Sequence, residues 1–202
     1  MIPEQLRWLG LRSYQLAFLI ALICITLQYM GLSEQLSYQR SLVASGQWWR
    51  LLSGNFVHLG SSHLWMNLAG LALVVSLVWS HFSFLHWLVI ILLCSVGVGT
   101  GLWFFNPEVE GYVGFSGTLH GLIIAGTVAD FRSYPRSAAI LLALVVAKLI
   151  WEQVAGALPG SEATAGGMVL VDSHLYGAIC GAIVAPVIMA LNHRSKLFKS
   201  RN

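Results

Sequence analysis

Charged side chains are scarce in this sequence. Asp, Glu, Lys and Arg make up 9% of its 202 residues, whereas 57% are hydrophobic. Soluble domains carry roughly 25% charged residues. The mean hydropathy of +0.74 reflects the same imbalance. So few charges cannot cover a surface that faces water, and the apolar stretches approach the ~20 residues that a helix needs to cross a bilayer. The composition excludes an ordinary soluble protein and indicates an integral membrane protein.

Paired cysteines and metal-binding motifs are also missing. The three cysteines, Cys24, Cys94 and Cys180, each lie inside an apolar run, and neither a CxxC pair nor an HExxH motif occurs. These patterns favour packing over a disulfide or a zinc site. The net charge of +3 comes from basic residues spread over short loops, without the interleaved aromatic residues of a nucleic-acid surface. We expect no metal, no cofactor and no nucleic-acid partner.

The apolar runs predict an all-α membrane protein with six transmembrane helices in a single domain, residues 1–202. The first run is too long for the apolar core of a signal peptide and lacks a small-residue cleavage site after it. The fourth run is short for a full crossing. The predicted spans are residues 14–32, 61–80, 84–104, 115–129, 136–153 and 173–191. The longest connections between them are residues 33–60 and 154–172.

Lys and Arg predict the orientation, because cytoplasmic loops near the ends of spans are enriched in them. Eight basic residues fall on one side of the predicted spans: Arg7, Arg12, Arg132, Arg136, Arg194, Lys196, Lys199 and Arg201. The opposite side keeps Arg40 and Arg50 together with five of the eight acidic residues. Both termini are therefore expected in the cytoplasm, and the even-numbered spans begin on the opposite side.

Polar residues gather at the starts of the three even-numbered spans. Because these spans begin on the same side, the three groups lie at the same depth in the membrane. Ionisable and polar groups inside spans are functional candidates by default. The groups are His63 with Asn67, then Ser116 with Gly114, Gly117 and His120, and finally His174 after Asp172 and Ser173.

A hydroxyl, an imidazole and hydrogen-bond donors at one depth are what acyl transfer requires. Ser116 is the candidate nucleophile, and the glycines on either side leave its backbone uncluttered. Taken alone, Ser116 is equally compatible with a helix cap or a packing residue. Asp172 lies two residues from His174 and does not share its helix face, so we expect it to serve the helix N-terminus instead.

The order and spacing of these motifs resemble the rhomboid family of intramembrane serine proteases. The matching segments are Trp49-Arg50, His58, His63-Leu64-Trp65-Met66-Asn67, Gly114-Phe115-Ser116-Gly117 and His174-Leu175-Tyr176-Gly177 with Gly181. The resemblance implies a six-helix rhomboid bundle in which Ser116 attacks the scissile carbonyl and His174 is its base, as a dyad without an obligatory acid. It also implies an oxyanion hole formed by His63, Asn67 and the Ser116 backbone N–H.

His120 departs from the commoner rhomboid pattern, which often has tyrosine four residues after the nucleophile. In this respect the chain is similar to the rhombosortase subfamily. That resemblance implies a protease of the bacterial inner membrane with its active site toward the periplasm. Its substrates would be secreted proteins that end in a Gly-Gly motif, a hydrophobic span and a basic tail. His120 either packs under the His174 ring or handles a proton. Small residues predict close packing of the fourth and sixth helices, namely Gly117, Gly121, Gly177 and Gly181.

Two other functions fit parts of the pattern. A non-catalytic rhomboid-like protein would use the same fold to bind transmembrane clients, but it is expected to lack Ser116 or His174, and both are present. A haem- or metal-binding protein could use His63, His120 and His174 as ligands. The protease interpretation implies transmembrane protein substrates and membrane lipid as partners. The sequence leaves the oligomeric state open.

Overall fold

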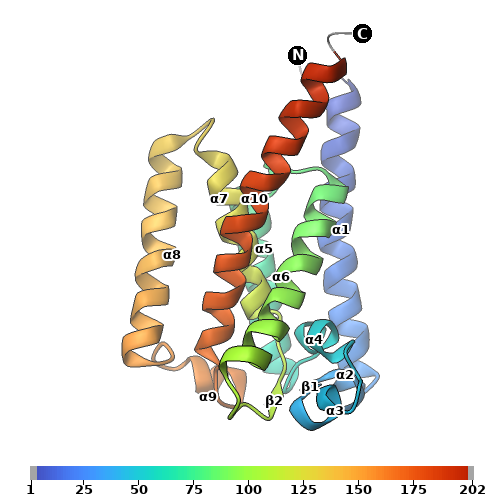
Figure 1. Ribbon diagram of the computed structural model, residues 1–202, viewed down its shortest axis with the longest axis vertical. Coiled ribbons are helices and arrows are strands. Elements are labelled where there is room, and N and C mark those ends of the chain that lie inside the picture. Colours follow the sequence, from blue (N-terminus) through green and yellow to red (C-terminus); the bar gives the residue numbers. More distant parts are fainter. Residues whose placement is uncertain (1–3, 200–202) are drawn as a thin grey trace.

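The computed structural model describes the backbone of residues 4–199 and the side chains of residues 13–193. Within this part of the chain, six long helices form a bundle (Figure 1). They are α1 (Glu4–Tyr29), α5 (Ser61–Val78), α6 (Phe84–Phe105), α7 (Ser116–Asp130), α8 (Pro135–Ala155) and α10 (Val171–Lys199). In Figure 1 the start of α1 and the end of α10 lie at the same end of the bundle.

Four segments of the described chain are long and apolar enough to cross a membrane. They are Ser61–His81 (α5 with the short 3₁₀ helix η2, Trp79–His81), Phe84–Phe105, Pro135–Ala155 and Val171–His193. The apolar part of α1, Ser13–Tyr29, is shorter, and α7 has 15 residues. The chain is therefore a mostly helical, multi-pass membrane protein. That all six helices cross the bilayer stays a prediction from the sequence.

The shortest of the six helices, α7, lies at the centre of the bundle. Twelve of its 15 residues are buried, and it packs against α5, α6, α8 and α10. A helix surrounded by protein buries its apolar side chains against its neighbours and presents little surface to lipid. A helix with little surface toward lipid need not match the thickness of the hydrocarbon core. The central position of α7 therefore accounts for its short length.

Glycines form the contact between α7 and α10. A Cβ on Gly121 would lie 2.7 Å from the carbonyl oxygen of Gly177, and one on Gly117 would lie 2.8 Å from the carbonyl oxygen of Ser173. From the other side, a Cβ on Gly177 or Gly181 would overlap the backbone of α7. Without side chains between them, the two backbones touch. This contact places the first turn of α7 beside the first turn of α10.

Residues 33–60, expected only as a connection, fold into a small cap at one end of the bundle (Figure 1). The cap consists of α2 (Ser33–Leu36), β1 (Tyr38–Gln39), α3 (Arg40–Ala44), α4 (Arg50–Ser53) and the 3₁₀ helix η1 (Gly54–Phe56). β1 pairs antiparallel with β2 (Gly111–Tyr112), which follows α6. The second long connection, 154–172, contains the short helix α9 (Ser161–Ala165).

Arg50 holds the cap together, and Arg40 anchors it to α6. Arg50 is 6% exposed and donates to the carbonyl oxygens of Glu34 at 3.2 Å and Ser37 at 2.6 Å. Arg40 donates to the carbonyl oxygen of Trp103 at 2.6 Å, in the last turn of α6, where carbonyl groups lack partners inside the helix. Both guanidinium groups therefore bind backbone carbonyl oxygens. This gives Arg40 and Arg50 a structural reason to lie on the side opposite the predicted cytoplasmic side.

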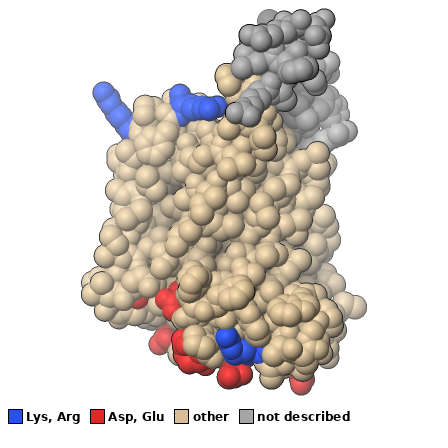
Figure 2. Space-filling model, in the orientation of Figure 1, with Lys and Arg blue, Asp and Glu red and all other residues tan. Residues whose placement is uncertain are grey.

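Charge is divided between the two ends of the bundle (Figure 2). On the face shown, acidic side chains gather at the end that carries the cap, and basic side chains lie at the opposite end and beside the cap. Arg132 and Arg136, expected on the cytoplasmic side, are exposed where α7 leads into α8. The other basic residues of the orientation argument lie outside the described side chains, namely Arg7, Arg12, Arg194, Lys196, Lys199 and Arg201. Cytoplasmic termini therefore stay a prediction.

Candidate active site

A sharp turn places Ser116 at the start of α7. Gly114 has a φ of +120°, which residues with a Cβ rarely adopt, and a Cβ there would also lie 2.6 Å from Cε1 of His63. The Tyr112 hydroxyl donates to the carbonyl oxygen of Gly114 at 2.6 Å. Burial raises the pKa of Tyr112 to about 12, so this hydroxyl keeps its proton. Glycine at 114 thus lets the chain turn beside His63 and makes Ser116 the first residue of α7.

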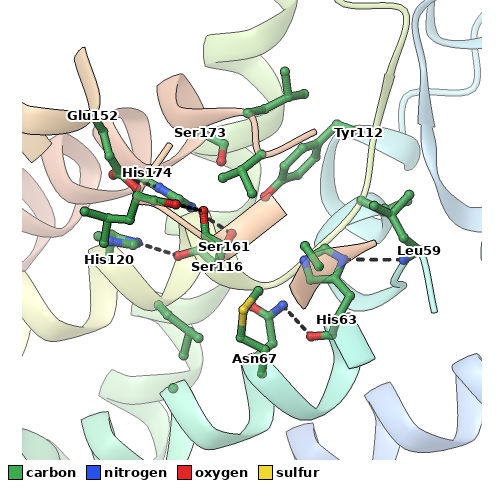
Figure 3. Close-up of a pocket in the computed structure, with 18 of the residues that line it drawn as sticks. Leu59, His63, Asn67, Tyr112, Ser116, His120, Glu152, Ser161, Ser173 and His174 are labelled. Atoms are coloured by element: carbon green, nitrogen blue, oxygen red, sulfur yellow. Dashed lines mark hydrogen bonds and ion pairs between the residues drawn. The ribbon is translucent and has the colours of Figure 1, made fainter. Parts of the chain in front are cut away.

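Ser116 and His174 meet across the contact between α7 and α10 (Figure 3). Ser116 Oγ lies 2.9 Å from Nε2 of His174, whose side chain is buried in the first turn of α10. The first N–H groups of a helix have no partner inside it, so the Ser116 N–H is available to a ligand. A hydroxyl and an imidazole at this distance can exchange a proton.

His120 lies one turn further along α7 and packs against the His174 ring. The two rings stack with their centroids 4.2 Å apart and 22° between their planes. His120 Nδ1 also lies 2.8 Å from the carbonyl oxygen of Ser116. A carbonyl oxygen only accepts, so this contact places the proton of the neutral ring on Nδ1. His120 therefore touches both the backbone of Ser116 and the ring of His174.

His63 and Asn67 line the same cavity from α5. The Leu59 N–H donates to Nδ1 of His63 at 3.4 Å, so the neutral His63 ring carries its proton on Nε2. The Asn67 amide nitrogen donates back to the carbonyl oxygen of His63 at 3.0 Å. The buried side-chain oxygen of Asn67 has no hydrogen-bond partner within the described part of the chain. His63 thus has a donor ready for a ligand, and Asn67 keeps one amide hydrogen for the same purpose.

His58, which lies in the cap just before α5, packs behind His63. The two rings meet edge to face, with centroids 5.1 Å apart. Neither nitrogen of the buried His58 ring has a hydrogen-bond partner among residues 13–193. Burial, and then the nearby His63, lower the pKa of His58 to about 3. His58 is therefore neutral at physiological pH and supports the position of the His63 ring.

These polar side chains lie at one end of a cavity of about 770 Å³ (Figure 3). The rest of the lining is mostly apolar. Part of it comes from α5, α7 and α8, including Leu73, Val74, Leu77, Leu119, Ile123, Leu141 and Val145, and the remainder comes from the cap, from β2 and from the connection 154–172. A cavity with apolar walls and a polar end suits an apolar segment of polypeptide whose backbone reaches Ser116.

Glu152 of α8 is a further member of the site, which the sequence analysis missed. Its Oε2 lies 2.9 Å from Nδ1 of His174, and its Oε1 lies 2.7 Å from Nζ of Lys148. An ionisable residue inside an apolar run is a functional candidate by default, and this signal could have found it. Asp172 does not contact His174: it accepts from Nδ2 of Asn106 at 2.7 Å, at the start of α10.

A comparison with protein families matches residues 45–191 to the Rhomboid domain, which is more than half of the chain. The chain belongs to the rhomboid family. No curated protein matches it significantly. Rhomboids are in general intramembrane serine proteases, and the segment that matches contains Ser116, His174 and Glu152.

Three side chains of this rhomboid also lie close enough to hold a metal ion. His120, Glu152 and His174 each offer one ligand atom, and these atoms lie within 4.8 Å of one another. His120 and His174 are also, with His63, the three residues that the sequence suggested as haem or metal ligands. The Lys148 ammonium group, 2.7 Å from the Glu152 carboxylate, would repel a divalent cation. The imidazole rings of the cluster also stack instead of converging on one point. The donor set therefore fits proton transfer better than a metal centre.

Proposed function

We propose that this rhomboid is an intramembrane serine endopeptidase, which cleaves a peptide bond in or next to the transmembrane segment of membrane-anchored proteins. The 2.9 Å contact between Ser116 Oγ and His174 Nε2 carries the proposal. It joins a hydroxyl to the base that such a nucleophile needs. The cavity of about 770 Å³ beside this pair supports the proposal, because its apolar lining suits a transmembrane segment.

In the proposed reaction, Ser116 Oγ attacks the scissile carbonyl carbon while His174 Nε2 takes the hydroxyl proton. Negative charge builds on the carbonyl oxygen. The C–N bond then breaks, and His174 returns the proton to the leaving amine. Water attacks the resulting ester, again losing a proton to His174, and its hydrolysis restores the Ser116 hydroxyl. Every proton thus passes through one ring nitrogen.

We assign the oxyanion hole to the Ser116 backbone N–H and to the side chains of His63 and Asn67. The N-terminus of α7 favours negative charge at this point. The His63 ring presents Nε2–H, because Nδ1 accepts from the Leu59 N–H. In soluble proteases a single donor of this kind contributes about 2.7–4 kcal/mol to the stability of the transition state. The free amide hydrogen of Asn67 would complete the set.

The proposal places all six helices across the bacterial inner membrane, with both termini in the cytoplasm. The exposed Arg132 and Arg136 support this orientation, since they lie at the end of the bundle away from the cap and its acidic side chains. Ser116, His63 and His174 belong to the first turns of α7, α5 and α10, which begin at the cap end. The active site would then open toward the periplasm, from which water reaches it.

We further propose that the substrates are secreted bacterial proteins with a C-terminal Gly-Gly motif, a hydrophobic span and a basic tail, as in the rhombosortase subfamily. His120, where other rhomboids often have tyrosine, carries this finer assignment. A hydrophobic span suits the apolar walls of the cavity. Each glycine disfavours a helix by about 1 kcal/mol relative to alanine, so a Gly-Gly motif eases the local unwinding that exposes a peptide bond.

The test is cleavage in liposomes of a membrane-anchored protein that carries such a tail, with the new termini mapped by mass spectrometry. The wild-type protein should cut beside the Gly-Gly motif. Ser116→Ala and His174→Ala should abolish cleavage, because they remove the nucleophile and the base. Ser76→Ala, at an exposed serine of α5, is the matched control and should cleave like the wild type.

The possible outcomes separate the parts of the proposal. Cleavage by Ser116→Ala or His174→Ala would refute the assignment of nucleophile and base. Cleavage of a substrate with Leu-Leu in place of Gly-Gly would refute the tail specificity and leave the protease intact. Binding of the anchored substrate without any cleavage would favour a non-catalytic rhomboid-like protein that holds transmembrane clients.

A further inference from the structure

We infer that Glu152 completes a Ser116–His174–Glu152 triad, with Lys148 as its counter-ion, in place of the dyad that the family resemblance implies. This inference rests on the proposed protease function. Figure 3 shows the three side chains joined by two successive hydrogen bonds, one between Ser116 and His174 and one between His174 and Glu152. Glu152 does not touch the reacting atoms, so it is a positioning residue that acts through His174.

The carboxylate decides which nitrogen of His174 carries the proton. An ionised carboxylate can only accept, so in the 2.9 Å contact His174 Nδ1–H donates to Oε2 of Glu152. The neutral imidazole then has its free lone pair on Nε2, which accepts from the Ser116 hydroxyl at 2.9 Å. The other tautomer would present an N–H to Ser116 and could not take its proton. Glu152 therefore selects the reactive tautomer.

Lys148 compensates the charge of the buried carboxylate. Glu152 is 3% exposed, and an unpaired charge at such a site is costly. Lys148 Nζ lies 2.7 Å from Oε1, one helical turn away on the same face of α8. The two carboxylate oxygens thus have separate partners: one holds Lys148 and the other holds His174. When His174 becomes an imidazolium in the reaction, the carboxylate already lies beside it.

The contacts of the other groups around His174 do not select its tautomer, which supports the assignment of this role to Glu152. His120 stacks on the face of the ring and Ser116 bonds to Nε2, so neither contacts Nδ1. Asp172, two residues earlier in α10, bonds to Asn106. An ion pair that only stabilised α8 would need Lys148 and Glu152 alone. The additional bond to the base is what carries the inference.

The test compares cleavage kinetics of Glu152→Gln and Glu152→Asp in liposomes. Glutamine keeps the size of the side chain, but its amide can donate to Nδ1 and hold the wrong tautomer. In soluble triads the corresponding amide substitution lowers kcat by about 10⁴-fold, and we expect a loss of about 10²- to 10⁴-fold here with KM unchanged. Glu152→Asp keeps the charge and should recover at least about tenfold of that loss. Glu110→Gln, at an exposed glutamate, is the matched control and should keep wild-type kcat.

Two further measurements separate positioning from folding and from the protease function itself. A fluorophosphonate probe reacts with an activated serine without any natural substrate, so labelling of the wild type and none of Ser116→Ala would establish the nucleophile independently. Glu152→Gln should be labelled far more slowly than the wild type when equal amounts of folded protein are compared. Nitrogen NMR of histidine-labelled protein should report a proton on Nδ1 of His174 in the wild type and its loss in Glu152→Gln.

Wild-type kcat in Glu152→Gln, with Ser116→Ala inactive, would overturn the triad and leave the protease standing. A wild-type protein that neither cleaves nor reacts with the probe would overturn the protease function first. If Glu152→Gln does not fold, Lys148→Met decides. The triad requires that variant to lower kcat without changing KM, because the carboxylate loses its counter-ion, and wild-type kcat would overturn the inference.

Discussion

The central helix α7 has neighbours on two sides that are held in opposite ways. Toward α10 the backbones touch, since a Cβ on Gly121 would lie 2.7 Å from the carbonyl oxygen of Gly177. Toward α8 the contact is made by few side chains: three of the 21 residues of α8 are buried, namely Ala138, Leu149 and Glu152. One contact is fixed by main chain and the other by the edge of a largely exposed helix.

This difference divides the active site into two parts. Ser116 and His174 lie on the glycine contact, so the geometry of the proposed nucleophile and base is set by two touching backbones. Glu152 and Lys148 reach the site from α8, which also forms one wall of the cavity. A shift of α8 would therefore change the support of His174 and the width of the cavity without moving Ser116 relative to His174. The proposed reacting pair, Ser116 and His174, is therefore the rigid part of the site, and its carboxylate support is the adjustable part.

Breaking the backbone contact between α7 and α10 should have the largest effect on stability and cleavage. In Gly177→Ala the new Cβ would overlap the backbone of Gly117, and neither main chain can move aside without separating α7 from α10. Overpacking lowers the free energy of unfolding by about 1–3 kcal/mol in ordinary cores, and a clash with backbone lies at the upper end of that range. We expect lower thermal stability and loss of cleavage together. Thermal unfolding in detergent micelles and fluorophosphonate labelling of Ser116 measure the two effects.

A bulkier change on α8 is the control for this prediction. Ala143→Leu adds more volume than Gly177→Ala, but Ala143 is exposed on the outer surface of α8. This variant should unfold and cleave like the wild type. Equal unfolding temperatures for wild type and Gly177→Ala would mean that the glycine contact does not hold the nucleophile against the base.

Much of the fold follows from the sequence, because lipid imposes a simple rule on apolar runs. The expected ranges 84–104 and 136–153 lie within one or two residues of the ends of α6 and α8. The cap does not follow, because its helices have four or five residues, too few for a hydrophobic period. Its shape depends on contacts between distant residues, such as the bond from Arg50 to the carbonyl oxygen of Ser37.

In the site, sequence motifs single out Ser116, His120 and His174 but not Glu152. Motifs report residues that are neighbours along one helix, whereas Glu152 lies 22 residues from His174 and reaches it only through the packing of α8. Its spacing of four from Lys148 also makes it resemble an ordinary surface ion pair. Only the packing of the helices shows that the carboxylate is buried and shared with the base.

A smaller effect is expected at His120, which belongs to the rigid part and stacks on the base. His120→Ala removes the ring under His174, with which it stacks at a centroid distance of 4.2 Å, and lets that ring tilt. Misplacement of a catalytic group by about 1 Å can cost 10²-fold, so we expect kcat to fall by up to that factor. His120→Tyr restores an aromatic ring and should keep more activity than His120→Ala. Cleavage kinetics of the two variants, at equal amounts of folded protein, make the comparison.

The pH–rate profile of His120→Tyr decides what His120 does. If His120 only supports the base, the tyrosine variant should show the same ionisations as the wild type at a lower rate. An ionisation present in the wild type and missing in a still active tyrosine variant would contradict the supporting role and assign proton transfer to His120. Equal activity of His120→Ala and the wild type would show that the stack is not needed to hold His174.

The smallest effect on stability is expected where α8 touches the bundle. Leu149 is 7% exposed, lies between Lys148 and Glu152 in the sequence and packs into the main apolar core. Leu149→Ala should lower the free energy of unfolding by less than the ~2–5 kcal/mol lost when a fully enclosed leucine is replaced by alanine, because this site is at the edge of the bundle. The glycine contact of α7 with α10 stays intact. We nevertheless expect kcat to fall by up to about tenfold, since a looser α8 holds Glu152 less firmly against His174.

Ile150→Ala is the matched control for Leu149→Ala, because Ile150 follows it directly on α8 and is 59% exposed. It removes a similar side chain from the outer surface and should leave kcat unchanged. Equal losses in the two variants would attribute the effect to α8 in general and not to the contact that holds Glu152. The double variant Leu149→Ala/Glu152→Gln sharpens the result. If Leu149 acts through Glu152, its removal should add nothing to the loss already caused by Glu152→Gln, whereas additive losses would mean that Leu149 affects catalysis by another route.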